Sequence, residues 1–209
     1  MLTPFVLEGR HTRLEPLAAE HAPGLAAAAA EDRSGYAYTW VPDGTAEATA
    51  YVRSALADQA RGWALPWAVR RLADDRIVGS TRFLDLQVFG DSPTAPPEPP
   101  SDQRPPSVLE IGHTWYSASA RRTAVNTDVK LQLLGHAFDV WSVLRVTLKT
   151  DARNHASRTA IERIGGRFEG IRRVHMLATD GTLRDSAYFS ITRDEWPGVR
   201  AALGQRLSV

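Results

Sequence analysis

The fold is decided by residues 108–130, which read VLEIGHTWYSASARRTAVNTDVK. The composition of the first part predicts a strand over residues 108–116. From Val125 to Trp141 apolar residues recur every four positions, which predicts an amphipathic helix over residues 126–140. A strand that leads through a short loop into a helix is a basic unit of α/β packing.

The loop between this strand and this helix is a candidate anion site. The first backbone N–H groups of a helix have no partner within it, and they lie at the positive end of the helix dipole. Arg121 and Arg122 stand just before the helix, and a guanidinium presents a planar pair of donors to phosphate. Many helices begin with basic residues and bind nothing, so the loop alone leaves both interpretations open.

The rest of the chain predicts one domain over residues 1–209 in the α/β (α+β) class, with a twisted mixed sheet flanked by helices. We expect about seven strands, at residues 12–17, 67–70, 76–86, 108–116, 145–150, 167–177 and 185–192. We expect helices at residues 18–30, 45–60, 126–140 and 154–164.

Seven of the 13 prolines lie within residues 90–106, which we interpret as an exposed loop insertion between two strands. The less favoured interpretation of this segment is a lid or a docking segment.

Composition excludes several function classes. With 25 basic and 24 acidic residues the net charge is +1, so we expect neither a nucleic-acid partner nor a membrane surface. No apolar run is long enough to span a bilayer. The chain has no Cys, and its histidines lack ligand spacing, so we expect a cytoplasmic protein without a metal.

Several short motifs follow one another in a fixed order. They are Glu110-Ile111-Gly112, Arg121-Arg122-Thr123-Ala124-Val125-Asn126-Thr127, Asn154 with Ser157, Phe168-Glu169-Gly170, Asp180-Gly181, Arg184-Asp185 and Glu195-Trp196. Together they resemble the GNAT acetyltransferases, and within them most of all the branch that acetylates the N-termini of ribosomal proteins. The resemblance covers nearly the whole chain apart from the proline-rich insertion.

This resemblance implies a GNAT-like sheet that splays between its fourth and fifth strands. It implies acetyl-CoA as co-substrate and direct transfer of the acetyl group to a primary amine, either a protein N-terminus or a small molecule. By analogy only, it implies a homodimer.

The resemblance also implies which residues contact acetyl-CoA. The family loop usually reads Gln/Arg-x-x-Gly-x-Gly/Ala, and here Ala124 and Asn126 replace the two glycines. Asn tolerates left-handed backbone, so we expect Asn126 to preserve the loop. The expected contacts are Thr114, Trp115 and Tyr116 on the pantetheine arm, Arg121, Arg122, Thr123, Ala124, Val125, Asn126 and Thr127 around the pyrophosphate, and Asn154.

Four side chains are candidates for proton transfer. Glu110 lies 11 residues before Arg121, where some GNAT enzymes keep a general base, although a surface ion pair would explain it equally well. Strict alternation places His113 on the opposite face from Glu110 unless a bulge intervenes. The resemblance suggests Ser157 as the acid near the thiolate and His175 as a base for the acceptor, while an ordinary strand histidine is an equal alternative.

Two other functions stay open at this point. An amino-sugar or antibiotic acetyltransferase would be favoured by an acidic acceptor pocket. A non-catalytic CoA-binding regulatory module is suggested by the missing loop glycines and the proline-rich segment.

Overall fold

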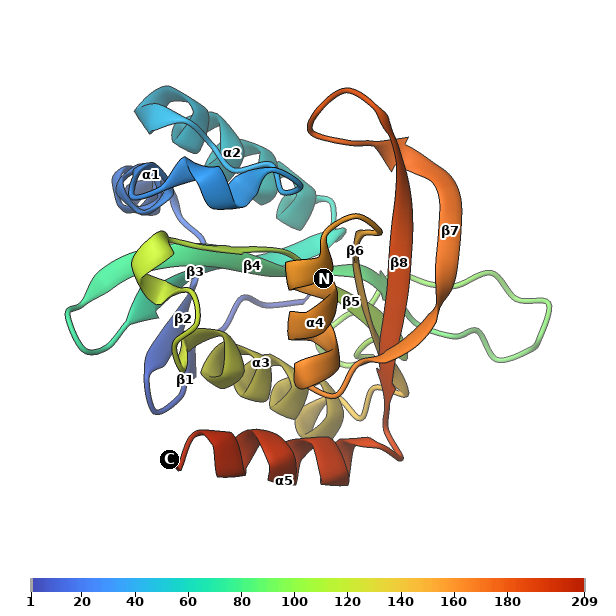
Figure 1. Ribbon diagram of the computed structural model, residues 1–209. Helices are drawn as coiled ribbons and strands as arrows, with labels where there is room; N and C mark the ends of the chain where they lie inside the picture. Colours follow the sequence, from blue (N-terminus) through green and yellow to red (C-terminus); the bar gives the residue numbers. More distant parts are fainter. Residues whose placement is uncertain (1, 209) are drawn as a thin grey trace.

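A computed structural model describes residues 2–208 and contains one mixed sheet with helices on both faces (Figure 1). The eight strands lie in the order β1-β2-β3-β4-β5-β6-β8-β7. Their bounds are Leu7–Glu8 (β1), Thr12–Pro16 (β2), Ala64–Arg71 (β3), Arg76–Gln87 (β4), Val108–Tyr116 (β5), Arg145–Asp151 (β6), Arg167–Leu177 (β7) and Leu183–Thr192 (β8). The expected α/β class and mixed sheet are confirmed; the additional strand, β1, has only two residues, too few to produce a sequence pattern.

Five α-helices accompany the sheet. They are Ala22–Ala30 (α1), Gly44–Ala60 (α2), Val125–Gly135 (α3), His155–Arg163 (α4) and Trp196–Arg206 (α5). A π-helical turn, His136–Val140, continues α3, so the predicted helix over residues 126–140 is present with a change of winding near its end. The sequence did not predict α5, because its Pro and two Gly residues hide the helical pattern. No helix within residues 2–208 is both long and apolar enough to cross a membrane.

Two hydrophobic cores lie on opposite faces of the sheet. The larger core packs α3 and α5 against residues such as Phe83, Leu109 and Phe189. The smaller core packs α1 and α2 against β3 and β4, around Ala68 and Trp115. In Figure 1, α1 and α2 cover only the part of this second face formed by β3 and β4, and the β7–β8 hairpin rises beside them. Neither α1 nor α2 has extensive contacts with β6 or β8.

The strands β5 and β6 separate partway along their length. They pair in parallel only over three positions, from Val108 opposite Arg145 to Glu110 opposite Thr147. The strand β5 then continues to Tyr116, paired with β4 alone. The expected splay between the fourth and fifth predicted strands is thus confirmed, and it lies between β5 and β6 in the structure.

A β-bulge interrupts β5 inside this splay. Ser80 of β4 pairs with Trp115 and Arg82 pairs with Gly112, so two steps along β4 match three steps along β5. His113 is the extra residue and has a φ of 48°. A bulge inserts one residue into the alternation and so exchanges the faces of the residues beyond it. Accordingly, Leu109 and Ile111 before the bulge and Tyr116 beyond it enter the larger core, whereas Trp115 enters the smaller one.

The start of α3 is fixed to the sheet by a buried carboxylate. Asp128 is 1% exposed and accepts hydrogen bonds from the backbone N–H groups of Arg10, His11 and Thr12 at 2.9 to 3.1 Å. The hydroxyl of Thr12 donates to the same carboxylate at 2.7 Å. This contact joins the β1–β2 turn to the first helical turn and holds the preceding loop in place.

The proline-rich segment, residues 90–106, forms an irregular loop between β4 and β5 (Figure 1). A single bridge between Val88 and Glu98 steadies its base. Within the loop, Arg104 forms ion pairs with Asp91 and Glu98.

Candidate active site

The loop that enters α3 presents a row of free backbone donors. Within residues 2–208 the N–H groups of Arg122, Thr123, Ala124, Asn126 and Thr127 donate no hydrogen bond to a protein acceptor. The N–H group of Val125 differs, because it donates to the hydroxyl of Thr123 at 3.2 Å. Five amides thus remain available at the positive end of the helix dipole.

The backbone of this loop corrects one expectation from the sequence. Its left-handed residue is Arg122, with a φ of 60°, whereas Asn126 lies within the first turn of α3. The expectation that Asn126 preserves the loop by adopting left-handed backbone is therefore wrong. A helical residue needs no glycine, so the replacement of glycine by Asn126 causes no backbone strain.

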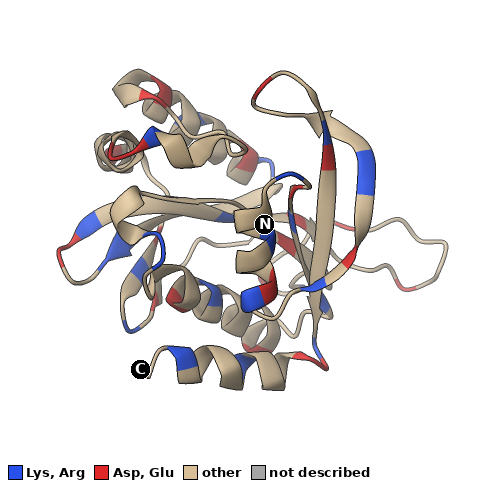
Figure 2. Ribbon diagram, viewed as in Figure 1, with Lys and Arg blue, Asp and Glu red and all other residues tan. Residues whose placement is uncertain are grey.

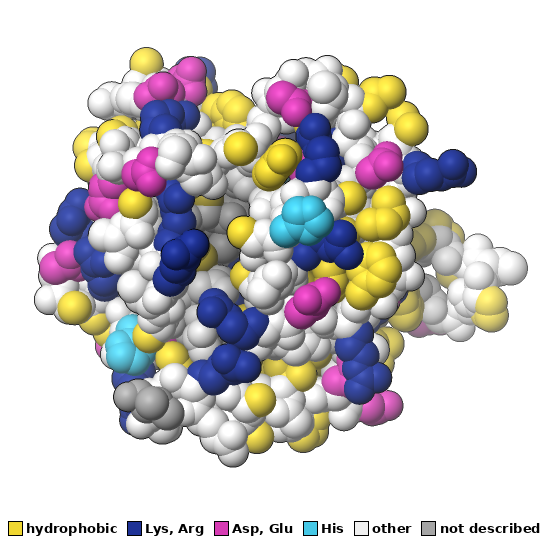
Figure 3. Space-filling model, in the orientation of Figure 1, with side chains coloured by type: hydrophobic (Ala, Val, Ile, Leu, Met, Phe, Trp, Pro, Cys, Tyr) yellow, Lys and Arg dark blue, Asp and Glu magenta, His cyan; other side chains and the backbone are white. Residues whose placement is uncertain are grey.

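The two adjacent arginines of the loop have different surroundings. Arg121 donates to the carbonyl oxygens of Tyr116 at 3.1 Å and Asp32 at 2.9 Å, and its guanidinium lies 4.4 Å from the ring centroid of Tyr36. It therefore holds the segment before α2 against the loop. Arg122 is exposed and has no hydrogen bond or ion pair to any residue in the described part of the chain. Figure 3 shows a hollow on this face with Lys and Arg side chains along its rim.

The side chains at the end of β5 point into the protein. Thr114 bonds to Thr81 at 2.7 Å and accepts from Lys130 of α3 at 2.9 Å. Trp115 belongs to the smaller core and Tyr116 to the larger. Because β6 has already diverged from β5 at this level, the backbone of Thr114 and Trp115 can face the splay. The carbonyl of Tyr116 already accepts from Arg121 and Tyr36.

Glu110 lies at the point where β5 and β6 separate. Its side chain is buried, and its carboxylate accepts a hydrogen bond from Lys149 of β6 at 2.6 Å. Burial raises the pKa of Glu110 above its usual value, although the charge of Lys149 acts in the opposite direction. Lys149 also lies 3.7 Å from the exposed carboxylate of Asp85. A buried carboxylate with a raised pKa and access to an opening in the sheet can take up a proton.

The bulge corrects the expected position of His113. Strict alternation places this side chain with Leu109 and Ile111 in the larger core, but in the structure it reaches solvent. His113 is exposed, and partial desolvation by the surrounding protein lowers its pKa to about 4, helped by the charges of Arg82 and Lys149. His113 is therefore neutral near neutral pH and shares Lys149 as a neighbour with Glu110.

Asn154 and Ser157 lie at the start of α4, across the splay. The Oδ1 atom of Asn154 accepts a hydrogen bond from the Ser157 N–H at 3.0 Å, which is the N-cap expected from the sequence. Both side chains are half-buried. Within residues 2–208 the hydroxyl of Ser157 has no protein partner, so it is free to donate a proton.

His175 of β7 belongs to a polar network that sequence reasoning missed. Its Nδ1 atom lies 2.9 Å from the hydroxyl of Ser186, and its Nε2 atom lies 3.2 Å from the hydroxyl of Tyr188. Ser186 also accepts from Nε of Arg184 at 2.9 Å. Burial, together with the charges of Arg172 and Lys149, lowers the pKa of His175. Polar residues at positions 184, 186 and 188 are the signal that could have identified this face of β8.

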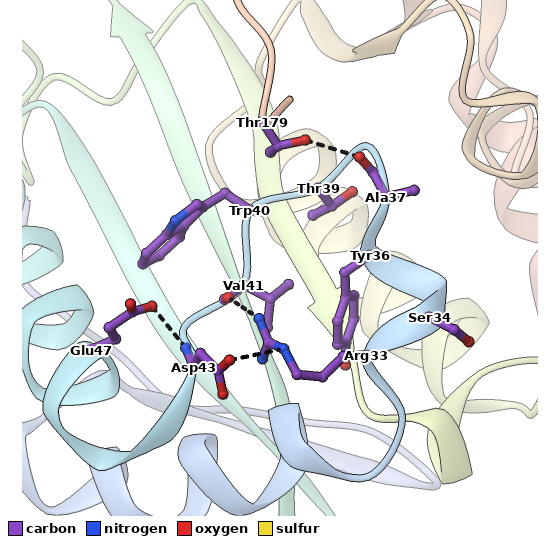
Figure 4. Close-up of a pocket in the computed structure, with 10 residues that line it drawn as sticks. All are labelled: Arg33, Ser34, Tyr36, Ala37, Thr39, Trp40, Val41, Asp43, Glu47 and Thr179. Atoms are coloured by element: carbon purple, nitrogen blue, oxygen red, sulfur yellow. Dashed lines mark hydrogen bonds and ion pairs between the residues drawn. The ribbon is translucent and has the colours of Figure 1, made fainter. Parts of the chain in front are cut away.

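A pocket lies between the segment before α2 and the tip of the β7–β8 hairpin (Figure 4). The hydroxyl of Thr179 donates to the carbonyl of Ala37 at 2.9 Å and closes one side of it. The ring of Trp40 in this pocket lies 5.9 Å from that of Tyr51, and the guanidinium of Arg82 lies 4.7 Å from the Tyr51 ring. These contacts connect the pocket to the surroundings of His113, since Arg82 is paired with the preceding Gly112.

No group of three His, Asp or Glu side chains within residues 2–208 converges as a metal site requires.

Comparison with known proteins defines the class. Residues 11–167 match the acetyltransferase (GNAT) domain family, and the chain belongs to this family. No curated protein sequence matches the chain. A crystal structure of a GCN5-related N-acetyltransferase from Brucella melitensis is 28% identical, with a TM-score of 0.82 over 97% of this chain and 85% of that one.

Two similar structures contain coenzyme A. Mycobacterium smegmatis RimJ, in complex with CoA-disulfide, is 18% identical with a TM-score of 0.76, covering 97% of this chain and 95% of that one. RimL, a ribosomal L7/L12 alpha-N-protein acetyltransferase in complex with coenzyme A, is 15% identical with a TM-score of 0.69, covering 91% and 99%. At these identities the likeness establishes the shared fold alone.

Proposed function

We propose that this protein transfers the acetyl group of acetyl-CoA to a primary amine on a protein N-terminus or a small molecule. The observation that carries the proposal is the row of five free amides at the start of α3, placed beside the splay of β5 and β6. A helix start of this kind binds phosphate groups through its backbone donors. The composition leads us to propose further that the protein acts in the cytoplasm, and the family resemblance alone that it is a homodimer.

The residues present fit acetyl-CoA in three places. The amides from Arg122 to Thr127 and the free guanidinium of Arg122 would hold the diphosphate. The backbone of β5 beyond Glu110 would hold the amides of the pantetheine arm, with Asn154 on the opposite side. The left-handed residue of the loop is Arg122, and not Ala124 or Asn126, which replace the two family glycines. The absence of these glycines is therefore no argument against acetyl-CoA binding.

In this proposal acetyl-CoA supplies a thioester, whose acetyl group moves to the amine nitrogen as the carbon–sulfur bond breaks. Glu110 takes the proton of the attacking amine, directly or through a water molecule, and Lys149 keeps the carboxylate ionised and oriented. The free hydroxyl of Ser157 returns a proton to the departing sulfur. His113, neutral and next to Glu110 in the splay, lines the path of the acceptor, while His175 stands further out in the network with Tyr188.

The charges around this site bear on the choice between an amino-sugar acceptor and a peptide or small-amine acceptor. An amino-sugar acceptor is cationic and would be favoured by surplus acidic groups, whereas three cations, Arg82, Lys149 and Arg184, and only one carboxylate, Asp58, act on His113. A peptide N-terminus or a small amine without several positive charges is therefore the acceptor that we propose first.

An assay of acetyl-CoA-dependent thiol release over N-terminal peptides, small amines and aminoglycosides tests the proposal. We expect turnover with at least one peptide or small amine, together with calorimetric binding of acetyl-CoA. Tight binding with no turnover on any amine would favour the non-catalytic module, and an absence of binding would contradict the proposed site.

The pH dependence of catalysis is expected to report Glu110. Glu110 acts as a base only when its carboxylate is ionised, so activity is lost as the pH falls through the pKa of Glu110. The midpoint of the acidic limb of the kcat/KM profile should therefore lie above the ordinary glutamate pKa of 4.5. Lys149→Met removes the charge that lowers this pKa, and the limb should move to higher pH. Lys149→Arg keeps the charge and serves as the control. A limb that stays in place in Lys149→Met would exclude Glu110 as the titrating group.

A further inference from the structure

The face of β8 that bears Arg184, Ser186 and Tyr188 carries a cation with no carboxylate within 4 Å, on which the more distant charges of Asp151 and Glu110 act. Arg184, Ser186 and Tyr188 alternate along β8 and so share one face. Tyr188 is directly opposite Lys149 in the register with β6, and Lys149 bonds to Glu110. The three β8 side chains therefore face the same side of the sheet as the proposed base. Figure 2 marks basic residues on both β7 and β8.

Arg184 has an unused guanidinium fork. Its Nε atom donates to the hydroxyl of Ser186 at 2.9 Å. Within residues 2–208 its two terminal nitrogens have no hydrogen bond, and no carboxylate lies within 4 Å of them. The side chain is half-buried, and this burial lowers its pKa. A partly desolvated guanidinium with a free fork is suited to a carboxylate in bidentate geometry.

A second arginine on the opposite side of His113 is only partly compensated. Arg82 is 4% exposed, and its Nε atom is buried without any hydrogen-bond partner. Its closest carboxylate is that of Asp58, at 3.4 Å, which is itself bonded to Arg61 at 2.6 Å. A buried donor left without a partner is energetically costly.

The carboxylates of this face already have partners. Glu110 is bonded to Lys149 at 2.6 Å, and Asp151 to Arg153 at 2.8 Å. The charges that act on His113 are those of three cations, Arg82, Lys149 and Arg184, against one carboxylate, Asp58. Consistent with this, the charges of Arg82 and Arg184 both lower the pKa of His113. Exposed Arg172, whose backbone pairs with Ser186 in the register of β7 with β8, adds to the same potential.

We infer that the acceptor amine carries a carboxylate, and that the free fork of Arg184 binds this carboxylate while the amine lies toward Glu110 and His113. This inference rests on the proposed function and names the substrate class of that same site. The carboxylate has two sources, the α-carboxylate of a free amino acid or an acidic side chain that follows the first residue of a peptide. Both present the same planar anion within a few bonds of the amine.

Two matched pairs of acceptors test the inference in the wild-type protein. The first pair is serine and serinamide, and the second is a hexapeptide beginning Ser-Asp and its Ser-Asn counterpart. Each pair differs in one carboxylate. We expect kcat/KM to be about 30-fold higher for the carboxylate member of one pair, and that pair identifies the source.

Variants of Arg184 separate recognition from folding. Arg184→Gln should remove the preference, so that the ratio of kcat/KM between the two members of the pair falls to about one. Arg184→Lys keeps the charge but loses the fork, so it should restore only part of the preference. Arg206→Gln removes an exposed arginine of α5, on the other face of the sheet, and should keep the full preference. Thermal unfolding checks that each variant is folded.

The outcomes distinguish this inference from the function on which it rests. Equal acetylation of both members of both pairs by the wild type overturns the inference and leaves the acetyltransferase function standing, whether or not Arg184→Gln folds. An Arg184→Gln protein that loses activity equally on charged and uncharged acceptors also overturns it. Failure to acetylate any of these acceptors or any amine of the wider panel overturns both.

Discussion

Replacement of Ala124 with aspartate is expected to weaken acetyl-CoA binding by roughly 100-fold, or about 2.7 kcal/mol. Ala124 immediately precedes the first residue of α3, and free amides lie on both sides of it. A carboxylate at this position repels the diphosphate and competes for the same N–H groups. The same carboxylate interacts favourably with the helix dipole, so the free energy of unfolding should stay unchanged or rise by about 0.3 to 1 kcal/mol.

The two opposite effects make this variant informative. Calorimetric titration with acetyl-CoA measures binding, and denaturant unfolding measures stability. Ala124→Asn has nearly the same shape without the charge and should lose far less affinity. If the Asp and Asn variants lose affinity equally, steric filling of the loop is responsible and the electrostatic account of the cradle is wrong.

Replacement of Glu110 with glutamine is expected to lower kcat by between about 100-fold and 10,000-fold, the range typical of a lost general base. Glutamine keeps the size of the side chain and an oxygen that can accept from Lys149. Calorimetric affinity for acetyl-CoA should change little, because the diphosphate contacts that we propose lie at the start of α3.

Asp85→Asn provides the matched control for this variant. Asp85 is the other carboxylate near Lys149, at 3.7 Å, and its side chain is exposed. Its removal should change kcat by less than about threefold. Steady-state rates at saturating acetyl-CoA compare the two variants. A Glu110→Gln protein with nearly full kcat would show that another group accepts the proton.

The sequence identified the parts of the site that are formed by neighbouring residues. The β5 strand, its loop and α3 have strong local patterns, and the N-cap pair Asn154 and Ser157 depends on a spacing of three residues. The position of His113 could not be derived in this way, because a bulge depends on the pairing of β5 with β4 rather than on β5 alone.

Contacts between strands that are far apart in the sequence could not be predicted from it either. Lys149 meets Glu110 because the parallel register of β5 and β6 brings together residues 39 positions apart. The network of His175, Tyr188 and Ser186 depends on the antiparallel register of β7 with β8. In the same way, the contacts that distinguish Arg121 from its free neighbour, with Asp32 and Tyr36, join segments that are far apart in the sequence.

The central claim is that the amides at the start of α3 bind the diphosphate of coenzyme A, and amide proton–nitrogen NMR spectra test it most directly. Titration with coenzyme A should shift the signals of Arg122, Thr123, Ala124, Asn126 and Thr127, whose N–H groups are free in the structure. ADP, which contains a diphosphate, should shift the same signals, and pantetheine should not. Signals that stay in place with coenzyme A, or that move as far with pantetheine, would contradict the account.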